Sequence, residues 1–159
     1  MARRRFFVEN IRGGYAALEG DEARHLRRVL RAEIGQLYEL SDNDRPYLAE
    51  IAEFGRDRVV FRITEPLAPR PESLEAVLYA ALVKFDRFEW MLEKATELGV
   101  TAIVPFEAAR SEKGLARAAC KRLERWRRIV REASQQSRRD RMPQVQPPST
   151  RTVRAAGST

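Results

Sequence analysis

Arginine side chains at helical spacing are the first feature of the sequence that could do chemistry. Residues 21–31, "DEARHLRRVLR", carry them at positions 24, 27, 28 and 31. A guanidinium group binds phosphate through two parallel hydrogen bonds and stacks on bases. The spacing therefore predicts contacts with the backbone of a nucleic acid. Because Arg greatly outnumbers Lys throughout the chain, a surface that is arginine-rich without binding anything is the alternative.

The charge distribution favours the same class of ligand. The 159 residues include 30 Lys and Arg against 23 Asp and Glu, which gives a net charge of +7. Residues 110–159 alone hold 14 basic and 4 acidic side chains. An uneven positive charge of this kind is typical of proteins that bind nucleic acid.

The composition argues against several other classes of protein. A single cysteine, Cys120, forms no internal disulfide, and with only one histidine, His25, the chain lacks the ligands of a zinc cluster. We expect no metal site. No apolar stretch reaches the length of a membrane helix, and the basic start lacks the apolar segment of a secretory signal. We therefore expect a cytoplasmic location and no membrane partner.

Residues 1–68 are predicted to form a β-rich domain. Segments such as "RRFFVE", "YELSD", "PYLAEIAEF" and "DRVVFRITE" read as short strands separated by turn residues. Residues 21–31 are the one expected helix, with Asp21 as its N-cap. Its apolar face consists of Ala23, Leu26, Val29 and Leu30. Residues 65–73, "EPLAPRPES", contain three prolines and indicate a linker.

The second half contains a strand–helix–strand unit that is typical of a parallel sheet. Residues 76–83 and 99–106 are apolar strands on either side of a helix over residues 86–98. We expect Asp86 to cap this helix, with Glu89 completing a capping box, and Gly99 to end it. The expected buried stripe is Phe88, Met91, Leu92, Ala95 and Leu98. A longer helix over residues 115–137 and a short strand at "QVQ" should follow.

Four motifs together resemble the RsmE family. They are "HLRRVLR" (25–31), "KATELGV" (94–100), "PFEAARS" (105–111) and "EASQQSRRDRMPQV" (132–145), in this order. Members of the family are methyltransferases that methylate N3 of a uridine in 16S rRNA of the small ribosomal subunit. Their methyl donor is S-adenosyl-L-methionine, and the active form is usually a homodimer. The resemblance implies an α+β two-domain fold: a PUA-like, RNA-binding β-barrel over residues 1–68, then the first half of an α/β SPOUT (trefoil-knot) domain over residues 74–159.

The chain departs from the family pattern after Val145. The glycine-rich and Leu-Arg-rich loops that form the family's knot and hold its methyl donor have no counterpart there. Gln135 also stands where the family often has glutamate, and Phe85 where it has glycine. The resemblance therefore implies no cofactor-binding residue in this chain and a truncated, inactive form of the enzyme. A non-catalytic RNA-binding remnant is the main alternative. A structural subunit that completes its sheet with another chain is a third.

The chemistry implied by the resemblance needs cations near the uracil oxygens, because a uridine that loses its N3 proton becomes an anion. Arg110 follows the strand 101–106 at the carboxyl end, where open α/β sheets bind ligands. Gln136 and Arg139 end the long helix within a family motif. These three are the catalytic candidates, although Arg110 also suits an exposed loop and Arg139 a helix C-terminus. The candidates for RNA binding are Arg3, Arg4, Arg5, Arg24, Arg27, Arg28, Arg31, Lys84 and Arg138.

Overall fold

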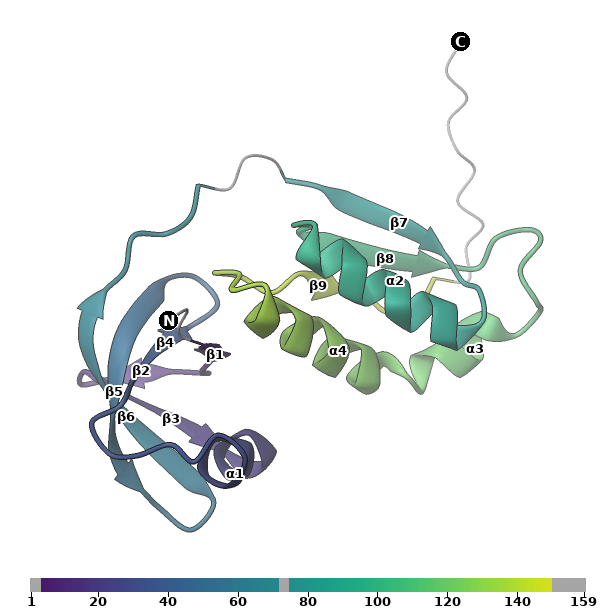
Figure 1. Ribbon diagram of the computed structural model, residues 1–159. Helices are drawn as coiled ribbons and strands as arrows, with labels where there is room; N and C mark the ends of the chain where they lie inside the picture. The colour runs from purple at the N-terminus through teal and green to yellow at the C-terminus, as the bar shows by residue number, and fades with distance from the viewer. Residues whose placement is uncertain (1–3, 72–74, 150–159) are drawn as a thin grey trace. The chain divides into compact units, whose positions relative to one another are not determined.

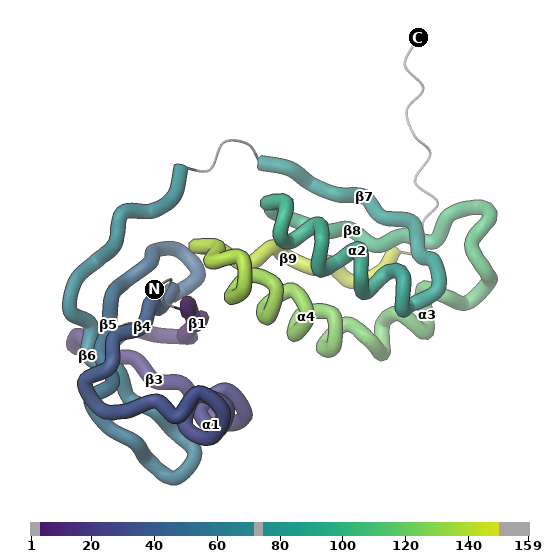
Figure 2. The backbone as a smooth tube through the Cα atoms, in the orientation of Figure 1, coloured from purple at the N-terminus to yellow at the C-terminus, as the bar shows by residue number. Residues whose placement is uncertain are grey.

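The computed structural model describes residues 4–71 and 75–149, which belong to two compact units (Figures 1 and 2). Unit 1 comprises the chain up to Pro71 together with Arg138–Arg141, and unit 2 comprises the rest. The segment Arg138–Arg141 thus belongs to unit 1 although it lies between two elements of unit 2 in the sequence. In the described part of the chain, no helix has the length and apolar character needed to cross a membrane.

A curled sheet of six strands forms most of unit 1 (Figure 1). Its strands are β1 (Arg5–Phe7), β2 (Ile11–Arg12), β3 (Tyr15–Glu19), β4 (Leu37–Ser41), β5 (Pro46–Phe54) and β6 (Arg58–Pro66). They lie in the order β1-β4-β5-β6-β3-β2, and only the β1–β4 pair is parallel among them. The four strands expected in residues 1–68 are confirmed. The sequence did not indicate β2 and β3, because they are short and alanine favours strands weakly.

The helix α1 (Gly20–Arg28) covers the core of unit 1 with Ala23 and Leu26. It is shorter than expected, because it ends at Arg28, where the amides of Val29 and Leu30 both donate to the carbonyl of His25, at 2.9 and 3.2 Å. Arg31 beyond it adopts a left-handed conformation, with φ 49°, and the Ala32 amide donates to the Leu26 carbonyl at 3.2 Å. Val29 and Leu30 are consequently exposed, so their predicted burial was wrong. The predicted N-cap was also wrong, because Glu19 holds that position and Asp21 lies in the first turn.

Unit 2 contains a parallel sheet in the order β7-β8-β9. Its elements are β7 (Val77–Ala81), α2 (Phe85–Glu97), β8 (Ala102–Phe106), α3 (Leu115–Cys120), α4 (Leu123–Gln136) and β9 (Gln144–Val145). Figure 1 shows α2 and α4 side by side, and the two helices are in contact. The predicted strand–helix–strand unit and the short third strand are confirmed. Gly99 follows α2 with a left-handed φ of 100°, as expected.

Three details of unit 2 differ from the sequence-based expectation. The N-cap of α2 is Lys84 rather than Asp86, and the helix begins at Phe85. Leu98 is 87% exposed, because it follows the last turn of α2 instead of continuing its buried face. The long helix over residues 115–137 is two helices. The amides of Lys121 and Arg122 donate to carbonyls three residues back, which closes α3 before α4 begins.

Trp126 fills the centre of the core of unit 2. The side chain on α4 is fully buried, and its ring centre lies 4.6 Å from that of Phe88 and 5.9 Å from that of Phe85. Both phenylalanines lie on α2. This cluster of aromatic rings therefore fixes the spacing between the two helices.

Replacing Trp126 with alanine should destabilise unit 2 by about 3–5 kcal/mol, because it leaves a large cavity between α2 and α4. Denaturant unfolding followed by far-UV circular dichroism measures this loss. Trp90 is the matched control, since 64% of it is exposed on α2. Trp90→Ala should change the stability by no more than about 0.5 kcal/mol. Equal effects of the two substitutions would contradict this account of the core.

Glu89 joins α2 to α4 by accepting hydrogen bonds rather than by closing a capping box. Arg125 donates to both of its carboxylate oxygens at 2.9 Å, and Arg122 donates at 3.1 Å. The hydrogen bond from Arg125, with help from Arg122 and against the effect of burial, lowers the pKa of Glu89 below its ordinary value of 4.5. A carboxylate of this kind stabilises the folded state above its ordinary pKa, and the contribution is lost as the pH falls through the lowered value.

Glu89→Gln should therefore lower the melting temperature at pH 7 by about 2–4 °C. It should also flatten the decrease of melting temperature below about pH 4.5, because the titrating group is gone. A thermal melt repeated from pH 7 down to pH 3 tests both effects. Glu112→Gln removes an exposed carboxylate and serves as the control. A pH profile that Glu89→Gln leaves unchanged would show that the pairing contributes nothing.

Candidate nucleic-acid interface

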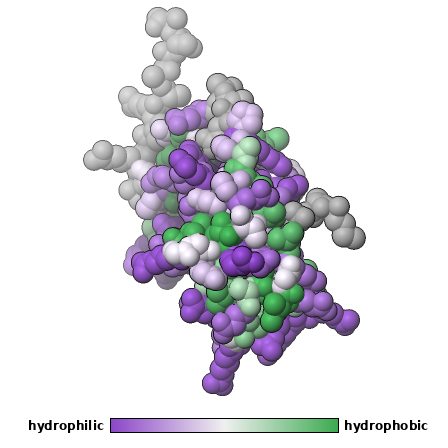
Figure 3. Space-filling model, turned by 90° about the vertical axis from the view of Figure 1, so that its left-hand side faces the viewer, coloured by the Kyte–Doolittle hydropathy of each residue, from purple (hydrophilic) through white to green (hydrophobic). Residues whose placement is uncertain are grey.

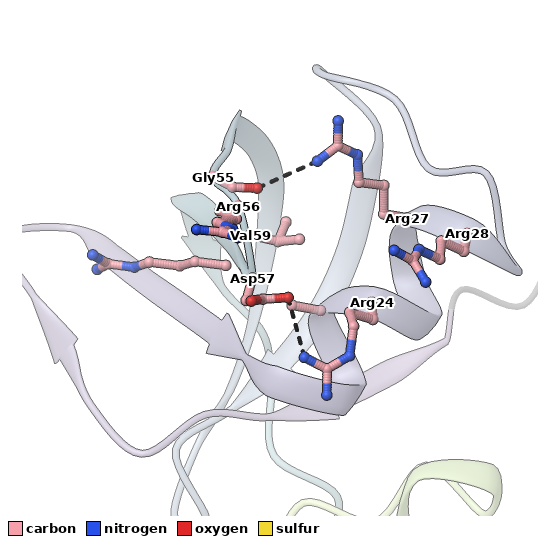
Figure 4. A pocket seen from close by; sticks show the side chains of 9 residues that line it. Arg24, Arg27, Arg28, Gly55, Arg56, Asp57 and Val59 are labelled. Atoms are coloured by element: carbon pink, nitrogen blue, oxygen red, sulfur yellow. Dashed lines mark hydrogen bonds and ion pairs between the residues drawn. The ribbon is translucent and has the colours of Figure 1, made fainter.

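A pocket of unit 1 lies between α1 and the turn that joins β5 to β6 (Figure 4). Its cavity volume is about 390 Å³. Five of the nine lining residues are arginines, and one is acidic. The lining residues are Ala23, Arg24, Arg27, Arg28, Gly55, Arg56, Asp57, Arg58 and Val59. The lining is therefore suited to an anion.

Backbone hydrogen bonds hold the two walls of the pocket in place. The amide of Gly55 donates to the carbonyl of Arg58 at 2.8 Å and closes the turn between β5 and β6. The amide of Gly20, the first residue of α1, donates to the carbonyl of Asp57 at 3.0 Å. Ala23 and Val59 are buried below the pocket. The arginines thus extend from a rigid base.

Arg24 is held by two carboxylates. It donates to Asp57 at 3.1 Å and also pairs with Asp21. The hydrogen bond to Asp21, followed by the one to Asp57, raises the pKa of Arg24 above its ordinary value. Arg27 donates to the carbonyl of Gly55 at 3.4 Å, as Figure 4 shows, and its guanidinium carbon lies 5.7 Å from the ring centre of Phe54.

Three arginines of the pocket, Arg27, Arg28 and Arg56, form no ion pair among the described residues. Arg27 is engaged by Gly55 and Phe54, which leaves Arg28 and Arg56 as the exposed guanidinium groups without such contacts. Figure 4 shows them on opposite sides of the pocket, Arg28 on α1 and Arg56 on the turn. Arg58 lies 3.7 Å from Glu19 and is partly neutralised.

On the face of the molecule shown in Figure 3, hydrophilic side chains surround smaller apolar patches.

Arg5, a candidate for RNA binding, lies in the interior of unit 1 with only 4% of its surface exposed. Its Nη2 donates to Glu39 at 2.8 Å, and its Nη1 donates to the carbonyl of Arg138 at 2.8 Å and to the carboxylate of Asp140. Arg138, another candidate, pairs with the second oxygen of Glu39. Because both guanidinium groups are engaged within the protein, we assign these two residues to the fold rather than to an RNA surface.

Two further hydrogen bonds, both to Asp140, hold the segment Arg138–Arg141 to the rest of unit 1. The hydroxyl of Ser41 donates to its carbonyl at 2.5 Å, and the amide of Arg70 donates to its carboxylate at 2.6 Å. Arg138 adopts a left-handed φ of 54°, which is uncommon for a residue with a side chain. Sequence analysis did not single out Glu39 or Asp140. The one available signal was an aspartate enclosed by arginines in "SRRDRM".

The other candidates for RNA binding lie in different places. Arg4 is half-buried, 3.3 Å from the Nε2 atom of His25, with its guanidinium carbon 5.6 Å from the ring centre of Phe6. Arg31 is exposed just beyond α1, and Lys84 is exposed at the N-cap of α2. Arg3 lies outside the described residues. Of the predicted set, the pocket unites Arg24, Arg27 and Arg28, and it adds Arg56 and Arg58, which sequence analysis missed.

The three catalytic candidates do not belong to one unit. Arg110 is exposed in the loop after β8, and Gln136 is the exposed last residue of α4. Arg139 is half-buried in the segment that belongs to unit 1. Their catalytic roles stay predictions. Within residues 4–71 and 75–149, no group of three or more His, Cys, Asp or Glu side chains is placed to hold a metal ion.

The loop after β8 is shaped by polar contacts of its own. The hydroxyl of Ser111 donates to the carbonyl of Leu82 at 3.0 Å and accepts from the amide of Ala108 at 3.1 Å. The carboxylate of Glu107 accepts from the amide of Ala116 at 3.1 Å. These side chains lie at the carboxyl ends of β7 and β8, where a ligand would bind, but they are engaged by the protein's own backbone.

Comparison with known proteins identifies the family. A family model described as an RNA methyltransferase domain matches residues 70–155, more than half of the chain. A second model, described as an RNA methyltransferase PUA domain, matches residues 18–64. The chain belongs to the RNA methyltransferase family. The PUA match includes α1 and the turn between β5 and β6, so the arginine pocket lies in the PUA-like unit of an RNA methyltransferase.

Individual relatives agree with this assignment. The ribosomal RNA small subunit methyltransferase E of Bacillus subtilis is 33% identical over 132 residues, which cover 81% of this chain and 52% of the relative. The crystal structure of the enzyme of the same name from Neisseria gonorrhoeae, bound to S-adenosyl methionine, has a TM-score of 0.81 at 31% identity; the match covers 92% of this chain and 62% of that one. The chain therefore spans about half the length of the B. subtilis relative and three fifths of the N. gonorrhoeae structure.

A third relative extends the comparison of folds. A putative methyltransferase from Legionella pneumophila, in complex with its bound cofactor SAM, has a TM-score of 0.82 at 26% identity; the match covers 94% of this chain and 64% of that one. These neighbours and the PUA match confirm the predicted fold class of the RNA methyltransferase, a PUA-like unit followed by an α/β SPOUT domain. A knot is not among the features that the described residues show.

Arg5→Gln should destabilise unit 1 by about 3–5 kcal/mol, because it leaves the buried carboxylates of Glu39 and Asp140 without their shared cation. Denaturant unfolding measures the loss. Arg12→Gln, at an exposed position of β2, is the control and should have almost no effect. A loss below about 1 kcal/mol for Arg5→Gln would contradict a structural role for this buried cluster.

Proposed function

We propose that the chain belongs to an enzyme that methylates N3 of a uridine in 16S rRNA, with S-adenosyl-L-methionine as the methyl donor. The observation that carries the proposal is the order of its parts. A PUA-like unit with an arginine-lined pocket precedes a methyltransferase domain, and this order agrees with that of structures named for methylation of small-subunit rRNA.

Unit 1 supplies RNA binding in this proposal. Guanidinium groups on α1 and on the turn between β5 and β6 attract the phosphate backbone. The contacts with phosphates position the RNA but carry little sequence information. Selection of one uridine therefore depends on the shape of the RNA and on contacts made elsewhere in the enzyme. The target base must be unpaired, since N3 lies in the Watson–Crick edge.

Unit 2 supplies residues near the reacting base. We infer that Arg110 approaches the uracil oxygens or a neighbouring phosphate, because a cation there stabilises the anion that forms when N3 loses its proton. Gln136 of unit 2 is a further candidate for this environment, and Arg139, in the segment that belongs to unit 1, stays a candidate for catalysis. S-adenosylmethionine, when bound, supplies the methyl group. We assign it no residue of the described chain, because Ser111 and Glu107 at the carboxyl ends of the strands already serve the loop.

A homodimer in the cytoplasm is part of the proposal. The apolar side chains of Val77 and Tyr79 on β7 and of Trp90 on α2 are each at least half exposed, and exposed apolar surface of this kind supports a protein contact. Sedimentation of the purified chain tests the dimer.

Deleting the coding sequence from its host should remove one methyl group from 16S rRNA, at N3 of a single uridine. Mass spectrometry of nucleosides from purified small-subunit rRNA measures 3-methyluridine directly. Restoring the gene in trans should return the modification, and rRNA of the large subunit serves as the control. Unchanged 3-methyluridine in the deletion strain would refute the proposed reaction.

A further inference from the structure

We propose that the pocket between α1 and the β5–β6 turn binds a single phosphodiester group of the RNA. The inference rests on the proposed function, since it takes RNA as the ligand. It goes further by assigning one phosphate to one pocket and by including Arg56 and Arg58. It also predicts that Asp57 weakens the binding of phosphate, whereas the arginines strengthen it.

The charges of the pocket support a monoanionic group. Five arginines and one aspartate line the cavity. Carboxylates already pair with Arg24, and Glu19 lies near Arg58. Arg27, Arg28 and Arg56 form no ion pair among the described residues. Because Arg27 is engaged by the Gly55 carbonyl and the Phe54 ring, two guanidinium forks remain for the two non-bridging oxygens of a phosphodiester.

The shape of the pocket supports a ligand of nucleotide size. A volume of about 390 Å³ lies near the lower end of the range for small-molecule sites. It accommodates a phosphate with its sugar rather than a folded stretch of RNA. Arg28 and Arg56 also come from different elements, a helix and a turn. They can thus approach one group from two sides, which arginines along a single helix face cannot do.

The turn is organised before the ligand arrives. Hydrogen bonds fix Gly55 to Arg58 and Gly20 to Asp57. Arg27 is placed over the ring of Phe54 and bonded to the carbonyl of Gly55. Little ordering of the backbone is therefore needed on binding, and this preorganisation favours affinity.

Asp57 opposes the ligand. Its carboxylate pairs with Arg24 at the wall of the pocket, so it removes positive charge from the cavity and repels a phosphate. Arg24 keeps a second partner, Asp21. Removing the charge of Asp57 should therefore strengthen phosphate binding without releasing Arg24 from its position.

The test compares two double variants of the full 159-residue chain. Arg28→Gln with Arg56→Gln removes the two guanidinium groups of the pocket that neither a carboxylate nor, as in Arg27, a carbonyl and a ring engages among the described residues. Arg12→Gln with Arg117→Gln removes the same charge from exposed positions outside it. Binding of a fluorescein-labelled hairpin of small-subunit rRNA is followed by fluorescence anisotropy at several salt concentrations, roughly 50 to 200 mM KCl.

The pocket variant should bind the hairpin about tenfold more weakly, and the slope of log affinity against log salt should fall by about one, as expected for one lost phosphate. The control should change affinity less than about threefold, which is the effect of net charge alone. Equal losses in both double variants would overturn the pocket as the phosphate site and leave the proposed function intact. No affinity of the unmodified chain for the RNA would overturn both.

Asp57→Asn supplies a test in the opposite direction. It should raise the affinity for the same hairpin about threefold, whereas Asp86→Asn, which removes an exposed charge from α2, should leave it unchanged. Weaker binding by Asp57→Asn would overturn the proposed electrostatics.

Melting temperatures of all variants should stay within about 2 °C of the parent, since the replaced side chains are exposed. The Nε–Hε NMR signals of Arg28 and Arg56 should also shift when the RNA hairpin is added to the unmodified chain, and unmoved signals would overturn the inference.

Discussion

Unit 1 depends on the hydrogen bonds and ion pairs of one buried guanidinium group, that of Arg5. A charge at 4% exposure is costly unless partners surround it, and its partners come from distant parts of the chain. Glu39 lies on β4, 34 residues after Arg5, whereas Arg138 and Asp140 lie 133 and 135 residues after Arg5. Both carboxylates pair with Arg5, and Glu39 also pairs with Arg138. The cluster thus joins Arg138–Arg141 to β1 and β4 of unit 1.

Because of this cluster, the motif at residues 132–145 contributes to both units of the structure. The stretch 132–145 ends α4 in unit 2, contributes four residues to unit 1, and then enters β9 in unit 2. Ser41 and the amide of Arg70 also bind Asp140, so those four residues are held by the end of β4 as well as by the segment after β6. Mutations at Arg138 or Asp140 should consequently affect RNA binding through the fold. A loss of activity in such variants would not by itself show that these side chains touch the RNA.

The sequence predicted the elements whose signals are local and missed those that depend on distant contacts. The strand–helix–strand unit and the left-handed Gly99 follow from apolar runs and a glycine. The helix α1 ends at Arg28, before the left-handed Arg31, and periodicity reveals neither feature. The break between α3 and α4 has no proline or glycine to mark it. The burial of Arg5 is not visible locally either, because "RRRFF" reads equally well as a surface patch until Glu39 and Asp140 are brought to it.

The arginine pocket shows the same limit at the level of function. Helical spacing predicted a row of four arginines on one helix, and a row of that kind offers charge without a defined geometry. The structure takes three of them, leaves Arg31 beyond the helix, and adds Arg56 and Arg58 from a turn about 30 residues away. Because α1 and the turn between β5 and β6 both contribute arginines, the positive charge lines a concave pocket of limited volume instead of lying along one exposed helix. A carboxylate at its wall, Asp57, then lowers the positive charge that the site offers to an anion, because it pairs with Arg24.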